Sequence, residues 1–458
     1  MEPEGVERAD LVVIGSGQGG VPLAVQMARD GKKVALFERG PFGGTCINVG
    51  CTPSKTLLAA AHAAGRARAA RRLGVVADAR VDQSVVFQRV HELRARWSAT
   101  TRGRLEDAGV EIIPAQAHFS GLRTVTGGGR TIEAPRVVVD VGTSPRVPDI
   151  PGLAGTPVLT NANVFDLDRF PDRLVVLGGG YIGLELGQGA QRLGTAVTIV
   201  HPHEHLLEKE ETDASDVLRA ALEEDGVRVI TGAEAASAAY DNGRFRLVLS
   251  SGVALEGEAL LVATGRRANT EALHLEATGV RHSGAGFIEV DDYLQTHCPG
   301  VYAIGDCAGQ PAFTHVSYED HRRLLSAFRG RPRRRDDRVL SYTTFTEPQL
   351  ARTGLTQAQA HAKGLRATTV TLPLSAVARA VEWDVERGFF RLVVDDDTDR
   401  ILGATFVGYE AGELIHVIVA HIEAGATWHV LEASMYVHPT LAEGMPTLAG
   451  LIPTERRR

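Results

Sequence analysis

Two cysteines separated by four residues, Cys46 and Cys51, are the side chains of this sequence best suited to chemistry. They lie in the run Gly43-Gly-Thr-Cys-Ile-Asn-Val-Gly-Cys-Thr-Pro-Ser-Lys55, where we expect a helix to begin. A helix N-terminus stabilises a thiolate, and this spacing lets the two sulfurs close a small, reducible ring. The alternatives are two buried thiols or half of a zinc site, and no second pair of zinc ligands stands out at matching spacing. We therefore predict a redox-active pair.

A glycine motif precedes the cysteines. Gly15-x-Gly17-x-x-Gly20 follows an apolar run, and Glu38 follows the next apolar run. Such glycines let the backbone turn tightly and approach a pyrophosphate at a helix N-terminus, and the acid accepts a hydrogen bond from a ribose hydroxyl. Residues 10–40 are thus predicted to form a strand–helix–strand unit that binds a dinucleotide.

A second copy of the motif, Gly178-x-Gly180-x-x-Gly183, starts 163 residues after the first. Here the second strand, residues 196–200, runs into His201-Pro-His-Glu-His205, with neither a ribose-binding acid nor an arginine for a 2′-phosphate. The choice between NADH and NADPH therefore stays open. The three histidines could suggest a metal site, but Pro202 argues against the strand that would align them, and we predict no metal.

The organisation of the chain agrees with its length, since 458 residues suggest about three domains. Residues 55–110 have a helical pattern. A proline-rich stretch ending at Pro151 is typical of a domain crossing, and the charged segment 330–338 is typical of a linker. Beyond it, apolar runs and a helix from Gly412 to about residue 424 predict a terminal α+β unit.

Composition excludes several classes of protein. The net charge of −7 excludes a basic protein held on nucleic acid by phosphate contacts. No apolar run approaches the roughly 18 residues of a membrane-spanning helix, and the acidic N-terminus does not resemble a signal peptide, so we expect a cytoplasmic protein. Four cysteines make no disulfide scaffold, and Cys298 and Cys307 are expected to be buried thiols.

Together these motifs resemble the FAD-dependent pyridine nucleotide-disulfide oxidoreductases over essentially the whole chain. The cysteine run is highly specific to that family. Three further motifs match: Gly-Gly-Gly-Tyr-Ile-Gly-Leu-Glu185, Thr296-x4-Val-Tyr-Ala-Ile-Gly-Asp306 and His438-Pro-Thr-Leu-Ala-Glu443. The resemblance implies an α/β fold of two Rossmann-like domains, for FAD and NAD(P)H, and a C-terminal α+β dimerisation domain. The implied boundaries are 1–150 and 270–335 for the FAD domain, 151–269 for the NAD(P) domain and 340–458 for the dimerisation domain.

The resemblance also implies roles for individual residues. Cys51 would lie against the flavin, and Cys46 would exchange with the substrate. Lys55, one of only five lysines, would pair with Glu185 near the reactive flavin nitrogen. His438, held by Glu443 and contributed by the partner subunit of a homodimer, would move protons for Cys46. The implied cofactor-binding residues are Gly15, Gly17, Gly20, Glu38, Gly44, Thr45, Lys55 and Asp306 for FAD, and Gly178, Gly180, Gly183 and Gly265 for the nicotinamide dinucleotide.

The electron acceptor stays open. The stretches Pro311–Arg322 and Thr346–Thr356 are most similar to the mercuric-reductase-like branch, which includes metal-ion reductases. Mercuric reductases, however, carry a C-terminal cysteine pair that this sequence lacks, and usually a tyrosine in place of His438. Three hypotheses therefore stay open. The enzyme reduces a small disulfide, a metal ion or an oxidant-stress product; or it is a dihydrolipoamide dehydrogenase, alone or within a 2-oxoacid dehydrogenase complex; or its flavin reduces a quinone directly.

Overall fold

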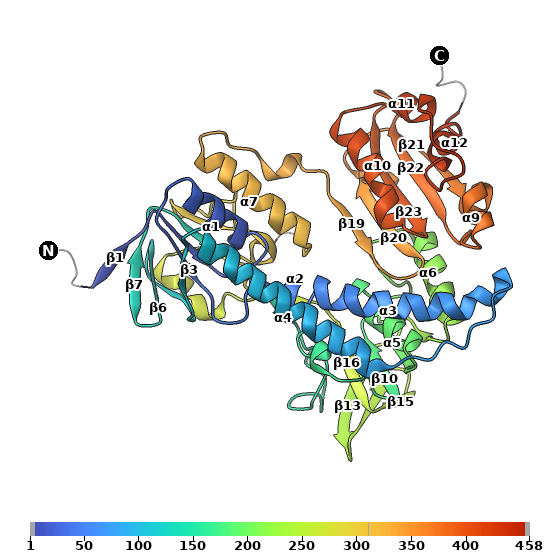
Figure 1. Ribbon diagram of the computed structural model, residues 1–458, viewed down its shortest axis with the longest axis horizontal. Coiled ribbons are helices and arrows are strands. Elements are labelled where there is room, and N and C mark those ends of the chain that lie inside the picture. The colour runs from blue at the N-terminus through green and yellow to red at the C-terminus, as the bar shows by residue number, and fades with distance from the viewer. Residues whose placement is uncertain (1–4, 310, 454–458) are drawn as a thin grey trace.

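Three units make up the computed structural model, which describes residues 5–309 and 311–453 (Figure 1). The unit that carries the N-terminus lies at the left of Figure 1, a second unit lies below, and the C-terminal unit lies at the upper right. Two long helices, α3 (Cys51–Ala69) and α4 (Gln83–Asp107), run across the middle between them. The expected α/β fold is confirmed.

The first unit is built on a parallel sheet whose three central strands are short apolar runs buried on both faces, as parallel strands usually are. The sheet order is β18 (Val301–Ala303), β8 (Val137–Val139), β2 (Leu11–Ile14), β3 (Val34–Phe37) and β4 (Glu111–Ile113). Helix α1 (Gly20–Arg29) joins β2 to β3, which confirms the predicted unit over residues 10–40. A smaller sheet beside it has the order β1 (Val6–Arg8), β7 (Arg130–Glu133), β6 (Thr124–Gly127) and β5 (His118–Gly121).

Distant parts of the chain complete this first unit. Strand β18 pairs in parallel with β8, and the following helix α7 (Thr314–Phe328) packs against α1. The second unit is inserted in sequence between β8 and β18. The two chain segments that connect it to the first unit pair as short antiparallel strands, β9 (Thr143–Pro145) and β17 (Arg266–Ala268). One sheet therefore combines residues from before 140 and after 300.

The second unit repeats the same plan. Its parallel sheet has the order β12 (Arg228–Ile230), β11 (Ala196–Val200), β10 (Arg173–Leu177) and β16 (Ala259–Val262). Helix α5 (Tyr181–Arg192) joins β10 to β11, as the second glycine motif predicts, and α6 (Thr212–Glu224) follows. A small antiparallel sheet completes the unit with β13 (Ala235–Asp241), β14 (Arg244–Leu249) and β15 (Ala254–Gly257).

The C-terminal unit is an antiparallel sheet covered by helices, as the change of pattern after residue 338 predicts. The sheet order is β19 (Ser341–Thr344), β20 (Gln349–Gly354), β23 (Ile401–Gly408), β22 (Phe389–Asp395) and β21 (Ala367–Pro373). Trp428, Phe390 and Phe406 are fully buried at its centre. Its helices are α8 (Gln357–Ala362), α9 (Ala378–Glu382), α10 (Ala411–Glu423), α11 (Trp428–Ala433) and α12 (Gly444–Ala449).

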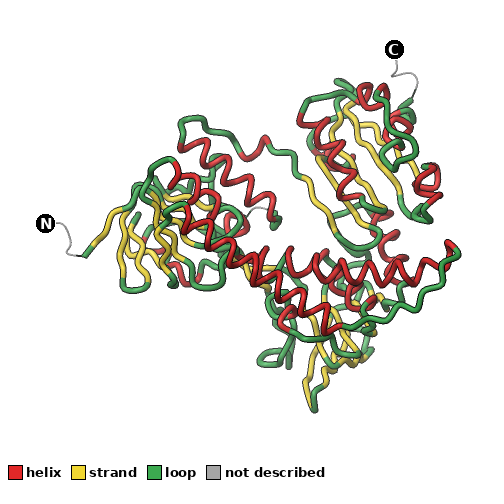
Figure 2. The backbone as a smooth tube through the Cα atoms, in the orientation of Figure 1, coloured by secondary structure: helices red, strands yellow, loops and turns green. Residues whose placement is uncertain are grey.

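The helical stretch predicted over residues 55–110 is interrupted (Figure 2). After α3 the chain forms a short 3-10 turn, and Gly74 then adopts a left-handed φ of +82°, which ends the helical path. Asp82 begins α4 by accepting hydrogen bonds from the backbone N–H groups of Ser84 and Val85. The uninterrupted helical pattern was therefore wrong for residues 74–82. Over residues 5–309 and 311–453, the 3-10 turns are Ala70–Leu73, Val164–Asp166, Glu271–Leu273, Leu275–Ala277, Gly305–Ala308, Arg335–Asp337 and Leu374–Ala376.

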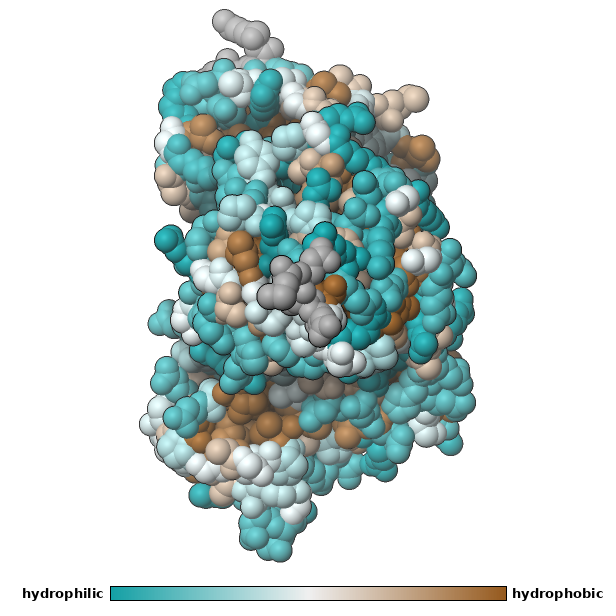
Figure 3. All heavy atoms as spheres, turned by 90° about the vertical axis from the view of Figure 1, so that its left-hand side faces the viewer, coloured by the Kyte–Doolittle hydropathy of each residue, from teal (hydrophilic) through white to brown (hydrophobic). Residues whose placement is uncertain are grey.

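The surface seen in Figure 3 is mostly hydrophilic, and apolar side chains gather in the hollow between the first unit and the unit below it. Within residues 5–309 and 311–453, no helix has the length and apolar character needed to cross a membrane.

Candidate active site

The two cysteines of the pair lie on consecutive helices. Cys46 is in α2 (Gly44–Asn48), and Cys51 is the first residue of α3. The turn into α2 needs glycine at position 43, where φ is +102° and a Cβ would lie 2.3 Å from the side chain of Ile47. Both cysteines are free thiols in this structure, Cys46 half-buried and Cys51 exposed. Cys51 Sγ lies 3.0 Å from Thr314 Oγ1, at the start of α7.

Electrostatics distinguish the two thiols. The hydrogen bond from Cys46 is the largest cause that lowers the pKa of Cys51, to about 6; the Thr314 hydroxyl and the Lys55 charge also lower it and burial opposes. The same hydrogen bond, together with burial and the neighbouring Cys51 charge, raises the pKa of Cys46. Cys51 is thus the thiolate of the pair, and Cys46 is the thiol that donates to it.

Lys55 lies one helical turn after Cys51 on α3, and it forms the expected pair with Glu185 of α5. Lys55 Nζ is 2.7 Å from Glu185 Oε2, and the Glu185 side chain is only 5% exposed. A third residue, Phe345, contacts both members of this pair. The Phe345 backbone N–H donates to Glu185 Oε1 at 2.9 Å, and Lys55 Nζ lies 4.5 Å from the centroid of the Phe345 ring.

The first glycine turn needs glycine at positions 15 and 17 because the surroundings leave no room for a side chain there. Gly15 has a φ of +104°, and a Cβ on it would lie 2.3 Å from the carbonyl oxygen of Asp140; a Cβ on Gly17 would lie 2.6 Å from the Asp140 carboxylate. That carboxylate accepts a hydrogen bond of 2.6 Å from the Gly20 N–H, and burial raises its pKa. A turn with these glycines before helix α1 suits the close approach of a dinucleotide diphosphate.

The cysteine motif is packed directly onto this turn. A Cβ on Gly44 would lie 3.0 Å from the Cα of Gly17, and the Gly43 N–H donates to the Ser16 carbonyl oxygen at 3.1 Å. Thr45 follows Gly44 in α2. The predicted FAD residues of the two motifs are therefore neighbours.

The two acidic residues predicted to bind FAD, Glu38 and Asp306, each lie just after a strand. Glu38, after β3, accepts hydrogen bonds of 2.8 Å and 2.6 Å from the Ser16 backbone N–H and hydroxyl. Asp306, in the turn after β18, accepts from the Thr143 hydroxyl at 2.8 Å, and burial raises its pKa. Both positions agree with carboxylates that orient toward a bound FAD.

The second glycine turn leaves space for a ligand. A Cβ on Gly183 would lie 2.0 Å from the carbonyl oxygen of Gly178, so packing explains that glycine. Gly180 caps α5 with an ordinary φ of −81°, and a Cβ on it would meet no atom within 4 Å. The open space at Gly180 therefore fits a dinucleotide at the N-terminus of α5. Gly265 combines a φ of +118° with similar open space.

His201 occupies the place that Glu38 has in the first unit. The Gly179 N–H donates to His201 Nδ1 at 3.1 Å, just as the Ser16 N–H donates to Glu38. Burial, followed by the charge of His203, lowers the pKa of His201, so its ring is neutral at pH 7. His203 instead pairs with Glu208 at 2.5 Å. In the described part of the chain, no group of three or more His, Cys, Asp or Glu residues is arranged to hold a metal ion.

The second pair of cysteines has a packing role, as predicted. Cys298 and Cys307 are buried, and their thiols donate to the carbonyl oxygens of Thr278 and Ile304. Burial raises the pKa of both thiols, which keeps them protonated.

His438 and Glu443 are brought together, but away from the cysteines. His438 Nδ1 lies 2.8 Å from Glu443 Oε2, and the His438 side chain is 74% exposed. The helices on either side of this segment, α11 and α12, lie at the far end of the C-terminal unit from α2 (Figure 1). In the described residues of one chain, His438 has no hydrogen bond or ion pair with Cys46 or Cys51.

Three residues of this site were not predicted from the sequence: Asp140, Thr314 and Phe345. Asp140 carried a usable signal, because an acid directly after the apolar run 137–139 sits where a parallel strand ends. Thr314 and Phe345 had no such signal, since their partners Cys51 and Glu185 are far away in sequence.

Comparison with known proteins agrees with the geometry. Residues 9–320 match the family model described as pyridine nucleotide-disulphide oxidoreductase, and residues 340–449 match the dimerisation domain of that family. A mercuric reductase of Bacillus cereus is 35% identical over 97% of this chain and 72% of its own length. A dihydrolipoyl dehydrogenase of Thermus scotoductus is 34% identical over 95% of both chains.

Solved structures are similar over their full length. The Cu(II) complex of RclA, a flavoprotein disulfide reductase of Escherichia coli induced by HOCl, has a TM-score of 0.89 and 31% identity, covering 98% of this chain and 100% of its own. LpdA of Mycobacterium tuberculosis has a TM-score of 0.87 and 29% identity over 97% of this chain and 99% of its own. The chain is an enzyme of the pyridine nucleotide-disulphide oxidoreductase family, which binds FAD and uses NAD(P)H.

Proposed function

We propose that this enzyme passes electrons from NAD(P)H through FAD to the Cys46–Cys51 pair, and from there to a small disulfide or a metal ion. The observation that carries the proposal is the asymmetry of the two thiols, in which Cys51 is the thiolate and Cys46 the donor. A pair poised in this way, packed onto a dinucleotide turn, suits stepwise disulfide chemistry.

Bound FAD supplies the two-electron relay between the nicotinamide hydride and the cysteines. We assign its binding to the turn Gly15–Gly20 with Gly44, Thr45, Glu38 and Asp306, and the binding of the nicotinamide dinucleotide to Gly178, Gly180, Gly183 and Gly265. Lys55 stabilises negative charge next to Cys51, and Glu185 orients Lys55. Because His201 presents no carboxylate that would repel a 2′-phosphate, we propose that NADPH is accepted as well as NADH.

With a disulfide substrate, the pair works in two exchanges. His438 accepts the proton of Cys46, and the Cys46 thiolate attacks one substrate sulfur, so that the substrate S–S bond breaks and the first product thiolate leaves with that proton. Cys51 then attacks Cys46, the mixed disulfide breaks, and the second product thiolate leaves as the Cys46–Cys51 bond re-forms. Both electrons of the pair are then in the products.

We propose that the partner subunit's His438 performs this step in a homodimer. Within one chain His438 is exposed, and the same segment exposes two large apolar side chains, Met435 at 99% and Val437 at 75%. Exposed apolar side chains beside a polar functional group are typical of a surface that a partner covers. The dimerisation domain match supports the same arrangement.

We also propose the domain boundaries 1–150 and 270–335 for FAD, 151–269 for NAD(P) and 340–458 for dimerisation, together with a cytoplasmic location, where thiols stay reduced. The sheet that joins strands from before 140 and after 300 supports the split FAD domain.

Two observations bear on the electron acceptor, and they support different classes of substrate. RclA was solved as a Cu(II) complex, and several relatives are mercuric reductases, which supports a metal ion. The exposed Cys51 and half-buried Cys46 equally suit a small disulfide. For either acceptor the pair has no thiol relay behind it, since Cys298 and Cys307 are buried.

The test is a panel of acceptors given to the purified flavoprotein with NADH and with NADPH: lipoamide, glutathione disulfide, Hg(II), Cu(II) and a quinone. The proposal expects turnover with a disulfide or a metal ion that Cys46→Ser and Cys51→Ser each abolish. A quinone turnover that survives both substitutions, with no activity on the other acceptors, would show instead that the flavin reduces the acceptor directly.

A further inference from the structure

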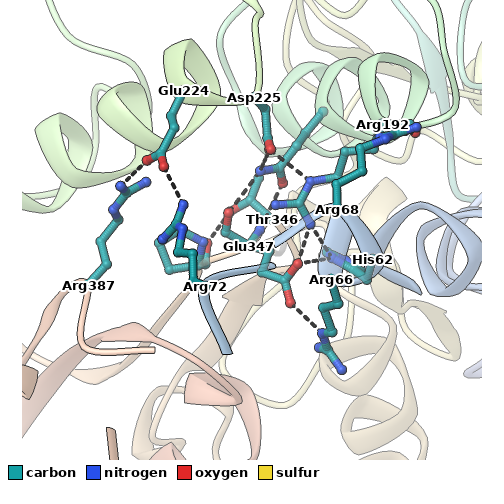
Figure 4. A network of polar contacts seen from close by, with 12 residues as sticks. His62, Arg66, Arg68, Arg72, Arg192, Glu224, Asp225, Thr346, Glu347 and Arg387 are labelled. Atoms are coloured by element: carbon teal, nitrogen blue, oxygen red, sulfur yellow. Dashed lines mark hydrogen bonds and ion pairs between the residues drawn. The ribbon is translucent and has the colours of Figure 1, made fainter. Parts of the chain in front are cut away.

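Residues Phe345–Glu347, between β19 and β20 of the C-terminal unit, form a short clamp between helices α3 and α5 (Figure 4). We call these three residues the clamp. Its inner end is Phe345, which contacts both members of the Lys55–Glu185 pair. Its outer end is Glu347, whose carboxylate lies among cationic side chains of both helices.

Helix α5 presents one row of polar side chains to the clamp. Glu185, Gln188 and Arg192 are three and four residues apart, so they share one face of the helix. Glu185 accepts from Phe345 N–H at 2.9 Å. Gln188 is 1% exposed, accepts from Glu347 N–H at 2.8 Å and donates to the Glu347 carbonyl oxygen at 2.8 Å. Its side-chain amide thus pairs with the clamp backbone as a neighbouring strand would.

Helix α3 presents a matching row. Lys55, His62 and Arg66 are seven and four residues apart and also share one face. Arg66 Nε lies 2.8 Å from Glu347 Oε1, and His62 Nδ1 lies 3.3 Å from Glu347 Oε2. The clamp is therefore bound to both helices at each of its ends.

The Glu347 carboxylate is the point at which the two rows meet. It binds Arg192 of α5 together with Arg66 and His62 of α3, and its side chain is 18% exposed. Burial alone would raise the pKa of Glu347, but the hydrogen bond from His62 and the charge of Arg192 lower it to about 2. The carboxylate is ionised at every pH at which the enzyme would work.

We propose that Glu347 is a positioning residue for the Lys55–Glu185 pair. By anchoring the clamp between α3 and α5, it holds the Phe345 ring against Lys55 and the Phe345 N–H on Glu185. This proposal rests on the function proposed above, because it assumes that Lys55 acts on the flavin and on Cys51. It adds a residue from the C-terminal unit to the control of a charge pair that the other two units share.

The decisive substitution is Glu347→Gln, which keeps the shape and the clamp backbone but removes the charge. Without its anchor the clamp shifts, and Lys55, whose side chain is already 37% exposed, moves away from Cys51. We expect the thiolate–flavin charge-transfer absorbance of the NADPH-reduced enzyme to titrate about one pH unit higher than in the wild type. The rate of flavin reduction, measured by stopped flow, should fall roughly 10- to 100-fold.

The matched control is Glu224→Gln. Glu224 binds Arg72 and Arg387, so it links the same regions of the chain in the same polar network but does not touch the clamp (Figure 4). Its loss should lower the melting temperature and leave both the titration and the reduction rate unchanged. Equal changes in the two variants would overturn the positioning role, as would wild-type values for Glu347→Gln.

Lys55→Met separates this proposal from the one on which it rests. If Lys55→Met leaves the titration and the rate unchanged, the role of Lys55 in the proposed function is wrong. If Lys55→Met alters them and Glu347→Gln does not, only the clamp is wrong. When both act as proposed, Glu347→Gln adds no further change to a protein that already carries Lys55→Met, because the two substitutions share one path.

Discussion

Cys51 and Thr314 are separated by 263 residues in the chain, yet the Cys51 sulfur lies 3.0 Å from the Thr314 hydroxyl oxygen. Each residue opens a helix, Cys51 at the start of α3 and Thr314 at the start of α7. The N-termini of both helices therefore face one sulfur, and this arrangement favours negative charge there.

Replacing Thr314 with valine removes a hydrogen bond that stabilises the Cys51 thiolate. A lowered pKa means that the thiolate is present above about pH 6 and is lost as the pH falls through that value. In Thr314→Val the midpoint should move upward by about one unit. Site-resolved alkylation of the reduced enzyme as a function of pH measures it. Thr314→Ser keeps a hydroxyl and should keep the wild-type midpoint of the Cys51 titration. A wild-type midpoint in Thr314→Val would contradict the prediction.

Glu347 should make the folded state sensitive to acid. Its pKa is lowered from 4.5 to about 2, so its ionised form stabilises the fold by about 3 kcal/mol above pH 4.5, and this stabilisation is lost as the pH falls toward 2. Glu347→Gln should therefore be less stable than the wild type at pH 7, with a gap that narrows below about pH 4.5. Urea unfolding at several pH values measures the gap. A gap that stays constant with pH would show that the charge of Glu347 does not stabilise the fold.

The nucleotide preference should respond to His201. A glutamate at this position would accept the Gly179 N–H as Glu38 accepts the Ser16 N–H, and its charge would repel a 2′-phosphate. In His201→Glu the ratio of NADH to NADPH affinity should rise by about tenfold or more, as one close charge pair allows. Equilibrium titration of each nucleotide measures this ratio, and His203→Gln serves as the neighbouring control. If the affinity ratio is unchanged in His201→Glu, the nucleotide ribose does not bind next to position 201.

Two inactive variants should restore activity when they share a dimer. Cys46→Ser and His438→Asn each remove one half of the proposed site. If the site combines Cys46 of one subunit with the partner subunit's His438, a mixed dimer holds one intact site. Random mixing of equal amounts should then give about a quarter of the wild-type turnover, and the isolated mixed dimer about half. Co-expression with two affinity tags yields the mixed dimers; if they are as inactive as the parents, the site lies within one subunit.

The sequence pattern predicted the parts of the fold in which neighbouring residues act together. Both strand–helix–strand units follow from glycines and apolar runs within about 30 residues, which is the range over which such motifs are specific. The break at Gly74 was missed because the alanine- and arginine-rich composition around it favours a helix. A left-handed glycine and a new capping residue, Asp82, override that preference.

The candidate site could be predicted only in part for a different reason. Lys55 and Glu185 were paired by resemblance, and the structure places them 2.7 Å apart. Thr314, Phe345 and Glu347 were missed because each acts on a partner more than 100 residues away. Asp140 also has a distant partner, Gly20, but its place directly after an apolar run was a signal that could have been used. The contacts of Thr314, Phe345 and Glu347 exist only after distant parts of the chain have packed together, and no local spacing encodes them.

The sheet that joins β18 to β8 and β2 has a consequence for the order of synthesis. A ribosome makes β2, the glycine turn and both active cysteines within the first 51 residues, but β18 and α7 emerge only after residue 300. Until then the nascent chain carries Cys46 and Cys51 without the Thr314 hydroxyl, and the sheet beneath the glycine turn has an open edge. Since domains generally fold as units during synthesis, the inserted second unit is complete first. The share of the Cys51 thiolate's stabilisation that comes from the Thr314 hydroxyl is therefore added late in translation, when most of the enzyme has already been made.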